Sequence, residues 1–310
     1  MVYFFHNYSL NFLQKRVDSL VSVKLNIKVL IAPLDWGLGH ATRCVPIITE
    51  LLKLGCKVII AAEGAQENLL KTEFPDLEFV NIPGYKIKYS GNKRFFAIKI
   101  LSQLPKIFKA ISLEKRWLQG FIQHTPVDAV ISDNRYGLHH SSIPSVFITH
   151  QLLIKAPFAF AEKVMQKINY LLIEKFAACW VPDEKGNRNI AGVLSHPSRY
   201  PEVPIKYLGG VSRLTKKELP ISYKLLVIVS GPEPQRTMLE KRVLAELMNF
   251  NEPVLFIRGM PVGKEVPTVK NNIIIKNHLP AIDLDYQPVV LGLNQQRGRG
   301  KQPKTNDAGV

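Results

Sequence analysis

A short stretch between an apolar run and a helical pattern holds the residues best suited to bind or transform a ligand. It reads APLDWGLGHATR and contains Gly37, Gly39, His40 and Arg43. A glycine-rich turn from strand into helix lets backbone N–H groups approach a ligand, and a helix start favours anions. His40 could orient or deprotonate a hydroxyl group, and Arg43 could pair with a phosphate or another anion. The competing interpretations are a helix cap for His40 and a surface ion pair for Arg43.

A second set of polar residues follows apolar runs later in the chain. Asp133 ends the run VDAVISD and is directly followed by Asn134 and Arg135, while His150 ends the run PSVFITH. Asp133 is a second candidate for a general base, with a helix cap as the alternative. Asn134 and Arg135 are candidates for binding an acceptor or a phosphate. His150 could line the same cleft or serve as a hydrogen-bonded core histidine.

These residues need strands and helices to hold them, and the sequence alternates between the two patterns. Short apolar runs alternate with helical spacing throughout residues 27–280. This alternation predicts an α/β architecture with doubly wound parallel sheets, in which ligands bind at the carboxyl ends of the strands. His40, Asp133 and His150 all fall at such ends. We expect helices over residues 43–54, 65–74, 94–123, 159–177 and 237–248.

The alternating pattern divides the chain into two domains. A leader over residues 1–26 is predicted to be poorly ordered and to stay outside the fold. We expect a first Rossmann-like domain over 27–211 and a second, incomplete one over 222–290, joined by a segment rich in Pro, Gly, Ser and Asn. Only three strands are predicted in the second domain. The remaining residues, 291–310, predict a disordered polar tail.

The net charge of +16 is concentrated in one part of the chain. Residues 86–116 contain nine Lys and Arg, interleaved with aromatic side chains, and Glu114 is their only acid. Such a stretch suits an anionic membrane surface or a phosphate-bearing partner. A solvated helix face is the equally open alternative. The basic QRGRGK near the end of the chain is better explained as a solvated end than as a nucleic-acid site.

The three cysteines show no ligand spacing, so the sequence predicts neither a zinc site nor a disulfide framework. This cysteine usage fits a reducing compartment. No apolar run is long enough to span a bilayer, and the first residues lack the basic region and the cleavage site of a signal peptide.

Several motifs, in this order along the chain, resemble those of GT-B glycosyltransferases, close to the family 28 type. They are DWGLGHATR, VISDNRYG with VFITHQ, CWVPDEKGNRNIAG and VSGPEPQRT, within residues 28 to 280. The resemblance implies two Rossmann-like domains and transfer of a sugar from a nucleotide-sugar, in the first place a UDP-sugar, to a sugar or lipid-linked acceptor. It implies no catalytic metal and no cofactor, because helix dipoles and backbone amides stabilise the departing diphosphate. It also implies a cytoplasmic protein, peripheral on the inner face of the membrane.

In this family the amino-terminal domain binds the acceptor and the carboxyl-terminal domain binds the donor. The resemblance therefore assigns His40 and Asp133 to catalysis, and the other polar residues of the first domain to the acceptor or a phosphate. Glu233 fits this assignment poorly, because a carboxylate repels a diphosphate unless it points away. The expected donor-binding residues of the second domain are Ser230, Gly231, Arg236, Thr237, His278 and Leu279.

Three alternatives compete with an active glycosyltransferase. Past residue 285 the sequence lacks the further units of the family, which predicts a truncated and inactive enzyme. The second alternative is a non-enzymatic remnant, or a basic protein that binds membranes or nucleic acid. The charged segment 86–116 favours this alternative. A dinucleotide-binding oxidoreductase is the weakest alternative, because Gly37, Gly39 and Glu63 fit its G-x-G-x-x-G pattern only loosely.

Overall fold

The computed structural model describes eight stretches of the chain, which form two compact units. The first unit contains the described residues up to 213, and the second contains those from 222 onward. The predictions for residues 1–26, 86–103 and 294–310 lie outside the described residues. The described stretches are 27–85, 104–155, 158–213, 222–231, 233–261, 266–269, 271–279 and 289–293.

A seven-stranded parallel sheet forms the centre of the first unit, in the order β3-β2-β1-β4-β5-β6-β7. The chain runs outward from β1 to β3 and then returns to the other side of β1 as β4. The carboxyl ends of β1 and β4 are therefore the point where the strand order reverses, which is where sheets of this kind bind their ligands. The strands are β1 (Lys28–Pro33), β2 (Lys57–Ala61), β3 (Glu78–Val80), β4 (Ala129–Asp133), β5 (Ser145–Ile148), β6 (Ala178–Val181) and β7 (Ile205–Tyr207).

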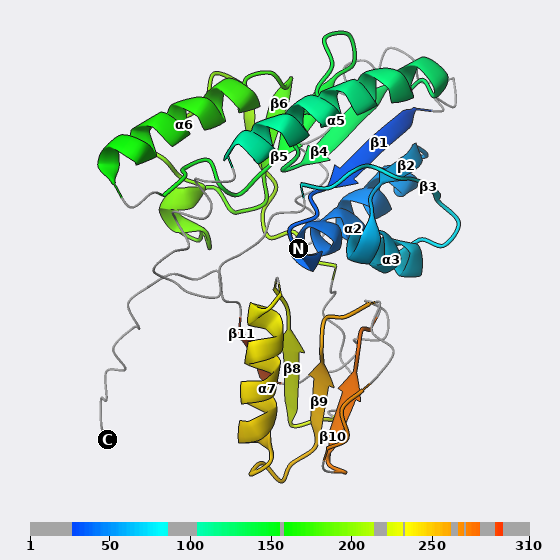
Figure 1. Cartoon of the computed structure of the whole chain (residues 1–310), viewed down its shortest axis with the longest axis vertical. Coiled ribbons are helices and arrows are strands. Elements are labelled where there is room, and N and C mark those ends of the chain that lie inside the picture. The colour runs from blue at the N-terminus through cyan, green and yellow to red at the C-terminus, as the bar shows by residue number, and fades with distance from the viewer. Residues whose placement is uncertain are drawn as a thin grey trace. The chain divides into compact units, whose positions relative to one another are not determined.

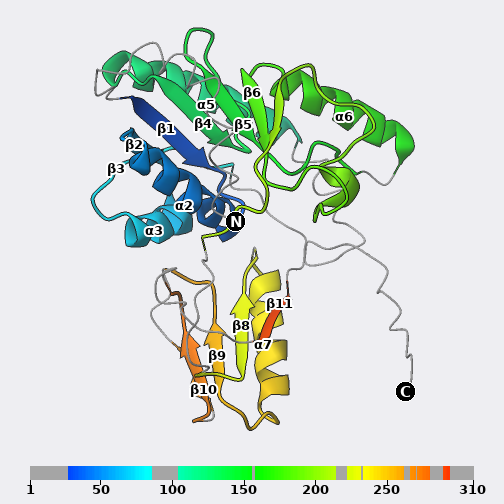
Figure 2. The ribbon, with the colours of Figure 1, turned by 180° about the vertical axis from the view of Figure 1, so that it is seen from behind.

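Helices cover both faces of this sheet (Figures 1 and 2). Successive strand residues point to opposite faces, so the two core clusters use alternate residues of β1. Val29 and Ile31 pack with α2 (Leu38–Lys53) and α3 (Gly64–Glu73), whereas Leu30 packs with Leu118 of α5 (Leu104–His124). On the face of α5, Phe147 of β5 packs with Ile173 of α6 (Ala159–Ile173). Burial on both faces explains why β1 and β2 read as continuous apolar runs.

The second unit has a four-stranded parallel sheet in the order β10-β9-β8-β11. Its core joins Val227, Phe256 and Ile273 of the sheet to Leu247 of the helix. The elements are β8 (Leu225–Val229), α7 (Gln235–Leu247), β9 (Val254–Ile257), β10 (Ile273–Lys276) and β11 (Val289–Leu293). Both units are parallel α/β sheets, as the sequence predicted. Within the described residues, no helix is both long and apolar enough to cross a membrane.

Two helix boundaries differ from the predictions, and two strands were not predicted. α2 begins at Leu38 rather than at 43, so Pro46 lies inside the helix and not in its first turn, and α6 ends at Ile173 rather than at 177. The segment 185–222, expected to be a connection, contributes the edge strand β7, whose three residues are only half-buried and show no apolar run. β11 adds a fourth strand to the second sheet by pairing with β8, and the predicted boundary between 290 and 291 falls inside it.

Candidate functional site

The start of α2 follows the carboxyl end of β1, the strand that pairs with β4. Gly37 precedes the helix with φ 125° and ψ 162°, a conformation that favours glycine. No side chain caps the start of the helix, and its first turn contains no acidic residue. No carboxylate of the helix therefore competes with a ligand for the first backbone N–H groups. Because the helix includes His40 and Arg43, these side chains lie one turn apart and reach the same point.

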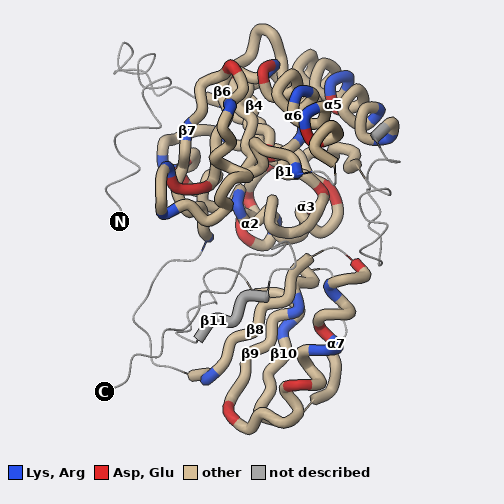
Figure 3. Tube along the Cα trace, turned by 90° about the vertical axis from the view of Figure 1, so that its left-hand side faces the viewer, with Lys and Arg blue, Asp and Glu red and all other residues tan. Residues whose placement is uncertain are grey.

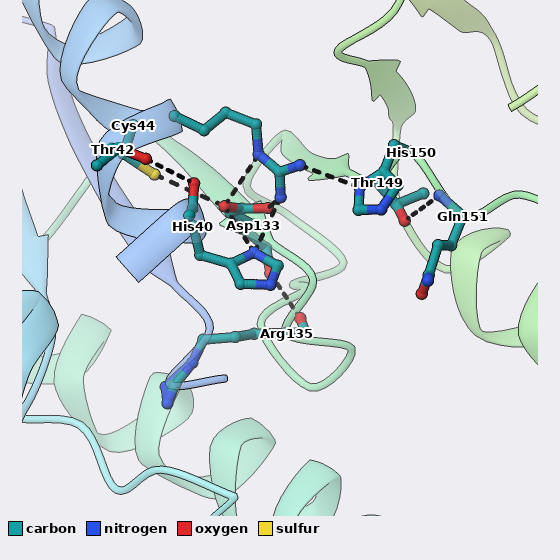
Figure 4. Close-up of polar contacts among 11 residues, drawn as sticks. His40, Thr42, Cys44, Asp133, Arg135, Thr149, His150 and Gln151 are labelled. Atoms are coloured by element: carbon teal, nitrogen blue, oxygen red, sulfur yellow. Dashed lines mark hydrogen bonds and ion pairs between the residues drawn. The ribbon is translucent and has the colours of Figure 1, made fainter. Parts of the chain in front are cut away.

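That point is the carboxylate of Asp133, at the end of β4 (Figure 4). His40 Nδ1 lies 3.1 Å from Asp133 Oδ2, and Arg43 Nε donates to the same oxygen at 3.3 Å. Arg43 Nη2 pairs with the other oxygen, Oδ1. Cys44 Sγ lies 3.9 Å from Oδ2. Two residues of one helix turn and the end of a neighbouring strand thus converge on one carboxylate.

Asp133 is completely buried, and its charge is stabilised by its partners. Burial by itself would raise the pKa of this carboxyl group, but Arg43 and His40 outweigh it and hold the pKa below its usual range. The group is therefore an ionised hydrogen-bond acceptor for the cluster and has no surface of its own to offer a ligand.

The imidazole of His40 has one nitrogen inside the cluster and one outside it. Nδ1 lies 3.1 Å from Asp133 Oδ2 and 2.9 Å from Arg43 Nη2. It can donate to the carboxylate or accept from the guanidinium, but it cannot do both at once. Within the described residues no hydrogen bond forms at Nε2, and 14% of the side chain is exposed. The arrangement leaves Nε2 available to a ligand.

His150, which follows β5, joins the cluster through Arg43 rather than through Asp133. Its Nδ1 lies 3.2 Å from Arg43 Nη1. Burial lowers the pKa of His150 to about 4, and the positive charge of Arg43 adds to the effect. The ring is therefore neutral over the ordinary pH range, and it is neither a pure core residue nor an isolated cleft residue.

Asn134 and Arg135, expected beside the same ligand, differ in their surroundings. Asn134 adopts φ 61°, and its buried Oδ1 has no hydrogen-bond partner among the described residues. Arg135 is only 1% exposed and is held by other parts of the unit. Its Nη2 donates to Pro83 O at 3.1 Å, and its Nε lies 3.4 Å from Oε1 of Glu114 on α5. Arg135 is therefore buried, and its Nε and Nη1 have no hydrogen-bond partner among the described residues, so its role toward an acceptor or a phosphate stays a prediction.

In the second unit, Arg236 is surrounded by acceptors of the protein. It is 5% exposed and donates from Nε to Glu233 Oε1 at 2.6 Å, and from Nη1 to Glu240 and to Arg258 O. Nη2 donates to Thr237 Oγ1 at 2.7 Å. The guanidinium predicted to meet a phosphate is thus occupied. The same contacts explain Glu233, whose carboxylate turns to Arg236 and to the N–H of Thr237.

The other predicted donor residues lie at the ends of strands in the second unit. Ser230 and Gly231 follow β8, and Gly231 has φ 135°, which favours glycine. His278 and Leu279 follow β10, and Leu279 packs against Leu226 and Leu255 of the core. The backbone of these segments remains the part that a ligand could contact.

Comparisons with solved structures bear on the arrangement of the chain. The sequence itself matches no protein-family model and no curated protein. The glycotransferase of kitacinnamycin is 12% identical with a TM-score of 0.50, over 84% of this chain and 73% of that one. Two further similar structures are the spinosyn forosaminyltransferase SpnP and MurG of Acinetobacter baumannii. They are 12% and 14% identical, with TM-scores of 0.48 and 0.37, over 83% and 86% of this chain and 72% and 68% of theirs.

The fold is of the GT-B type. This follows from two parallel-sheet units in one chain, together with the similarity to the kitacinnamycin enzyme. In this GT-B chain the acid of the dinucleotide pattern, Glu63, accepts a hydrogen bond from Gly84 N at 2.8 Å. That contact accounts for Glu63 within the protein and removes the main support for an oxidoreductase. Among the described residues, no three His, Cys, Asp or Glu side chains form a group that could hold a metal ion.

Sequence reasoning missed the buried partners on which this GT-B chain relies. Glu114 binds Tyr85 Oη at 2.8 Å and Gly137 N at 2.9 Å, and Glu240 binds both Arg236 and Arg258. Glu114 carried a signal, because it is the lone acid in a strongly basic segment. Glu240 carried none, because acids at helical spacing from basic residues are common on exposed faces.

Proposed function

We propose that this chain transfers a sugar from a nucleotide-sugar, in the first place a UDP-sugar, to a hydroxyl group of an acceptor. The cluster of His40, Arg43 and Asp133, at the point where the strand order of the first sheet reverses, carries the proposal. Transfer to a hydroxyl needs a base for its proton and stabilisation of the departing diphosphate. The cluster supports the first requirement, and the glycine-containing turn at Ser230 and Gly231, which leads into the N-terminus of α7, supports the second.

His40 is the proposed base, and Asp133 is the group that orients it. With Nδ1–H donating to Asp133, the lone pair of His40 lies on Nε2 and accepts the proton of the acceptor hydroxyl. The acceptor oxygen then bonds to the anomeric carbon as the bond from that carbon to the diphosphate oxygen breaks. The proton ends on His40, and the nucleoside diphosphate leaves with the electron pair. Asp133 stabilises the imidazolium that forms.

The remaining residues of the two units divide between acceptor and donor. On the acceptor side we assign the backbone of Gly37 and Gly39, and the unpartnered amide oxygen of Asn134. On the donor side we assign Ser230, Gly231, Thr237 and the backbone at His278. Arg236 is left out because protein acceptors take up its donors. The finer identification with family 28 is part of this proposal.

The test is turnover by the 310-residue chain, measured as release of UDP from UDP-sugars with a panel of hydroxyl acceptors. His40→Ala and Asp133→Asn are each expected to lower turnover at least tenfold, about 1.4 kcal/mol of barrier. His139→Ala is the control, because this half-buried histidine packs edge-on against Phe176 outside the cluster. Equal turnover in all three would remove the base assignment. No UDP release, with no UDP binding by calorimetry, would favour the non-enzymatic alternative.

A lipid-linked acceptor is the finer form of the proposal, and the outer faces of α5 and α6 support it. Both helices lie on the same face of the first sheet, and basic residues follow both of them in Figure 3. Phe160 is 80% exposed, and Val164 and Leu171 are also exposed on α6. Phe108 and Leu113 are the exposed large apolar residues of α5. The exposed cations beside them are Lys106, Lys109, Lys115 and Arg116 on α5 and Lys163 and Lys167 on α6.

Such a face suits an anionic membrane surface. The chain is expected to sediment with anionic but not with neutral vesicles, and to dissociate as salt rises, since the Debye length is about 8 Å at 0.15 M ionic strength. Changing Lys109, Lys163 and Lys167 to Glu should abolish sedimentation. Lys53→Glu on α2, which packs against the opposite face of the sheet, is the control. Equal sedimentation with both vesicle types would reject the proposal.

A further inference from the structure

Arg43 is the one residue of the cluster that contacts both histidines. Its guanidinium carries five N–H donors and no acceptor. A ring nitrogen whose one hydrogen-bond partner among the described residues is this guanidinium therefore presents a lone pair. His150 Nδ1 is such a nitrogen, 3.2 Å from Arg43 Nη1. In a neutral imidazole the proton then resides on the other nitrogen, so His150 carries its N–H at Nε2.

The surroundings of His150 keep the ring neutral, so this tautomer is fixed over the ordinary pH range. Burial has the largest effect on its pKa, which falls to about 4. Arg43 and His40 lower the pKa further, and the carboxylates of Asp133 and Asp183 act in the opposite direction. Protonation at Nδ1 would also turn two donors toward each other, which Arg43 opposes at any pH at which it is charged.

His40 is in the opposite situation. Its Nδ1 faces both an anion, Asp133, and a cation, Arg43. The bond from Nδ1–H to a buried, ionised carboxylate is charge-assisted and is about twice as strong as one between neutral groups. Arg43 loses little in that arrangement, because its Nε and Nη2 still pair with Asp133. Nδ1–H is therefore the favoured tautomer of His40, with the lone pair on Nε2.

We propose that Arg43 is a positioning residue that gives the two histidines opposite hydrogen-bond polarity. His40 presents an acceptor at Nε2, and His150 presents a donor at Nε2. A ligand can donate a hydroxyl proton to Nε2 of His40 and accept the N–H of His150 with a neighbouring oxygen. Because the two rings are not interchangeable, such a ligand binds in one orientation. Adjacent hydroxyl groups of a sugar have this chemistry. Naming the ligand as an acceptor sugar rests on the proposed function, whereas the two tautomers do not.

The tautomers are measured directly by two-bond proton–nitrogen correlation spectra of the full chain labelled with nitrogen-15 in its histidines. The chain supplies both reference patterns. His140 Nδ1 accepts from Ser142 N at 3.2 Å, which requires Nε2–H. His124 Nδ1 lies 2.9 Å from Gly120 O, a carbonyl that can only accept, which requires Nδ1–H. At pH 7.5 we expect His150 to match His140 and His40 to match His124. A His150 protonated at Nδ1 would overturn the proposal without any measurement of activity.

Variants of Arg43 test whether it causes this polarity. In Arg43→Ala the signals of His150 should change to a mixture of both tautomers, whereas Arg43→Lys, which keeps a cationic donor, should restore Nε2–H. If Arg43→Ala does not fold, because Asp133 is left buried and unpaired, the wild-type spectra and the lysine variant still decide the question. An unchanged Nε2–H pattern in a folded Arg43→Ala variant would show that Arg43 does not set the tautomer.

Variants of His150 test the donor against a ligand. The amide nitrogen of glutamine takes the place of Nε2 and keeps an N–H, whereas phenylalanine does not. His150→Phe should raise KM for the acceptor about tenfold, and His150→Gln by less than about threefold, because a lost neutral hydrogen bond costs about 1.4 kcal/mol. Equal KM values for the two variants would contradict the donor role. Absence of transfer in the wild-type chain would count against the proposed function and leave the tautomers as the spectra report them.

Discussion

The two units each contain a buried cluster built on arginine and carboxylate, and the two clusters use their hydrogen-bonding groups differently. In the second unit, Arg236 and Arg258 meet Glu240, and Glu233 and backbone oxygen complete the contacts of Arg236. In the first unit, Asp133 meets Arg43 and His40, and Arg43 continues to His150. Both lie where strands end. The first cluster includes two histidine rings, and the Nε2 atom of each lies outside the contacts within the cluster. The second cluster is built on arginine and glutamate side chains.

This difference separates a cluster that holds the fold from one that suits chemistry. Arginine can only donate and a carboxylate can only accept, and in the second unit protein partners take up four of the five N–H groups of Arg236. A histidine in such a cluster has one nitrogen fixed and a second whose character the first determines. In the second unit, the ion pairs of Glu240 with Arg236 and Arg258 therefore connect α7 to the end of β9, and we call this set of ion pairs the brace. In the first unit, each of the two histidine rings instead has one donor nitrogen and one acceptor nitrogen whose positions are fixed.

The brace should carry the larger structural effect. Glu240→Ala leaves two buried arginines without their shared carboxylate, so the free energy of unfolding of the second unit should fall by about 3–5 kcal/mol. Glu246→Ala, an exposed position on the same helix, is the control and should stay within about 0.5 kcal/mol. Hydrogen exchange resolved by unit is the measurement. A small loss of unfolding free energy in Glu240→Ala would mean that the brace contributes little to the stability of the second unit. It would contradict the view that this cluster has a structural role, whereas the cluster around Asp133 has a chemical one.

The loops at the strand ends allow the next comparison between the units. A methyl group added at Gly259 would lie 2.3 Å from Val229 O, where φ is +64°, whereas one added at Gly84 would meet the carboxylate ends of Asp35 and Glu63. Backbone cannot move aside as side-chain ends can. Gly259→Ala should therefore cost about 1–3 kcal/mol, and Gly84→Ala less than that. Denaturant unfolding of the two variants checks the order, and a larger loss in Gly84→Ala would show that Asp35 and Glu63 are held rigidly.

The last comparison concerns pH and two carboxyl groups of the first unit. Burial raises the pKa of Glu114 to about 7, although Arg135, Tyr85 and Gly137 oppose it, whereas the pKa of Asp133 is lowered. Between the ordinary carboxyl pKa and pH 7 the folded protein thus binds more protons at Glu114 than the unfolded chain does. Stability should fall as pH rises through this window, by at most about 1.4 kcal/mol per pH unit, and level off above it.

Asp133 acts in the opposite sense, since its contribution is complete above the ordinary carboxyl pKa and is lost as pH falls through its lowered value. The lowered pKa of His150 makes stability rise with pH over part of the same range, so the measurement is a comparison of two proteins. In denaturant titrations from pH 5 to 8, the stability of the wild-type chain relative to Glu114→Gln should fall as pH rises to about 7. If the variant keeps the same slope, Glu114 is not the group responsible.

The parts of the fold that the sequence predicted are those in which one physical signal dominates. β1 and β2 are buried on both faces, so their apolar runs were clear, and the turn after β1 was marked by glycines. β7 was missed because an edge strand of three half-buried residues needs no apolar run. The start of α2 was predicted too late because residues 38–42 were read as part of the glycine-rich turn, whereas the helix already begins after Gly37.

The candidate site was less predictable because the partner of a charged residue is set by folding. Strand ends placed His40 and Asp133 near each other, but nothing in the sequence showed that Arg43 would pair with Asp133 instead of with solvent. Arg135 and Arg236 looked available for anions. Their acids, Glu114 and Glu240, reach them only through packing of α5 and α7.

The pairing of β8 with β11 has a consequence for how the protein is made. β8 ends at Val229 and its neighbour begins at Val289, about 60 residues later in synthesis. At roughly 5–20 residues per second, the ribosome needs on the order of 3–12 s to synthesise the residues between β8 and β11, and one edge of β8 has no partner strand during that time. During that interval an apolar strand presents unpaired backbone groups to other chains. Slower translation of this region should therefore increase aggregation of the nascent protein and its dependence on chaperones, while the seven strands of the first sheet are already complete.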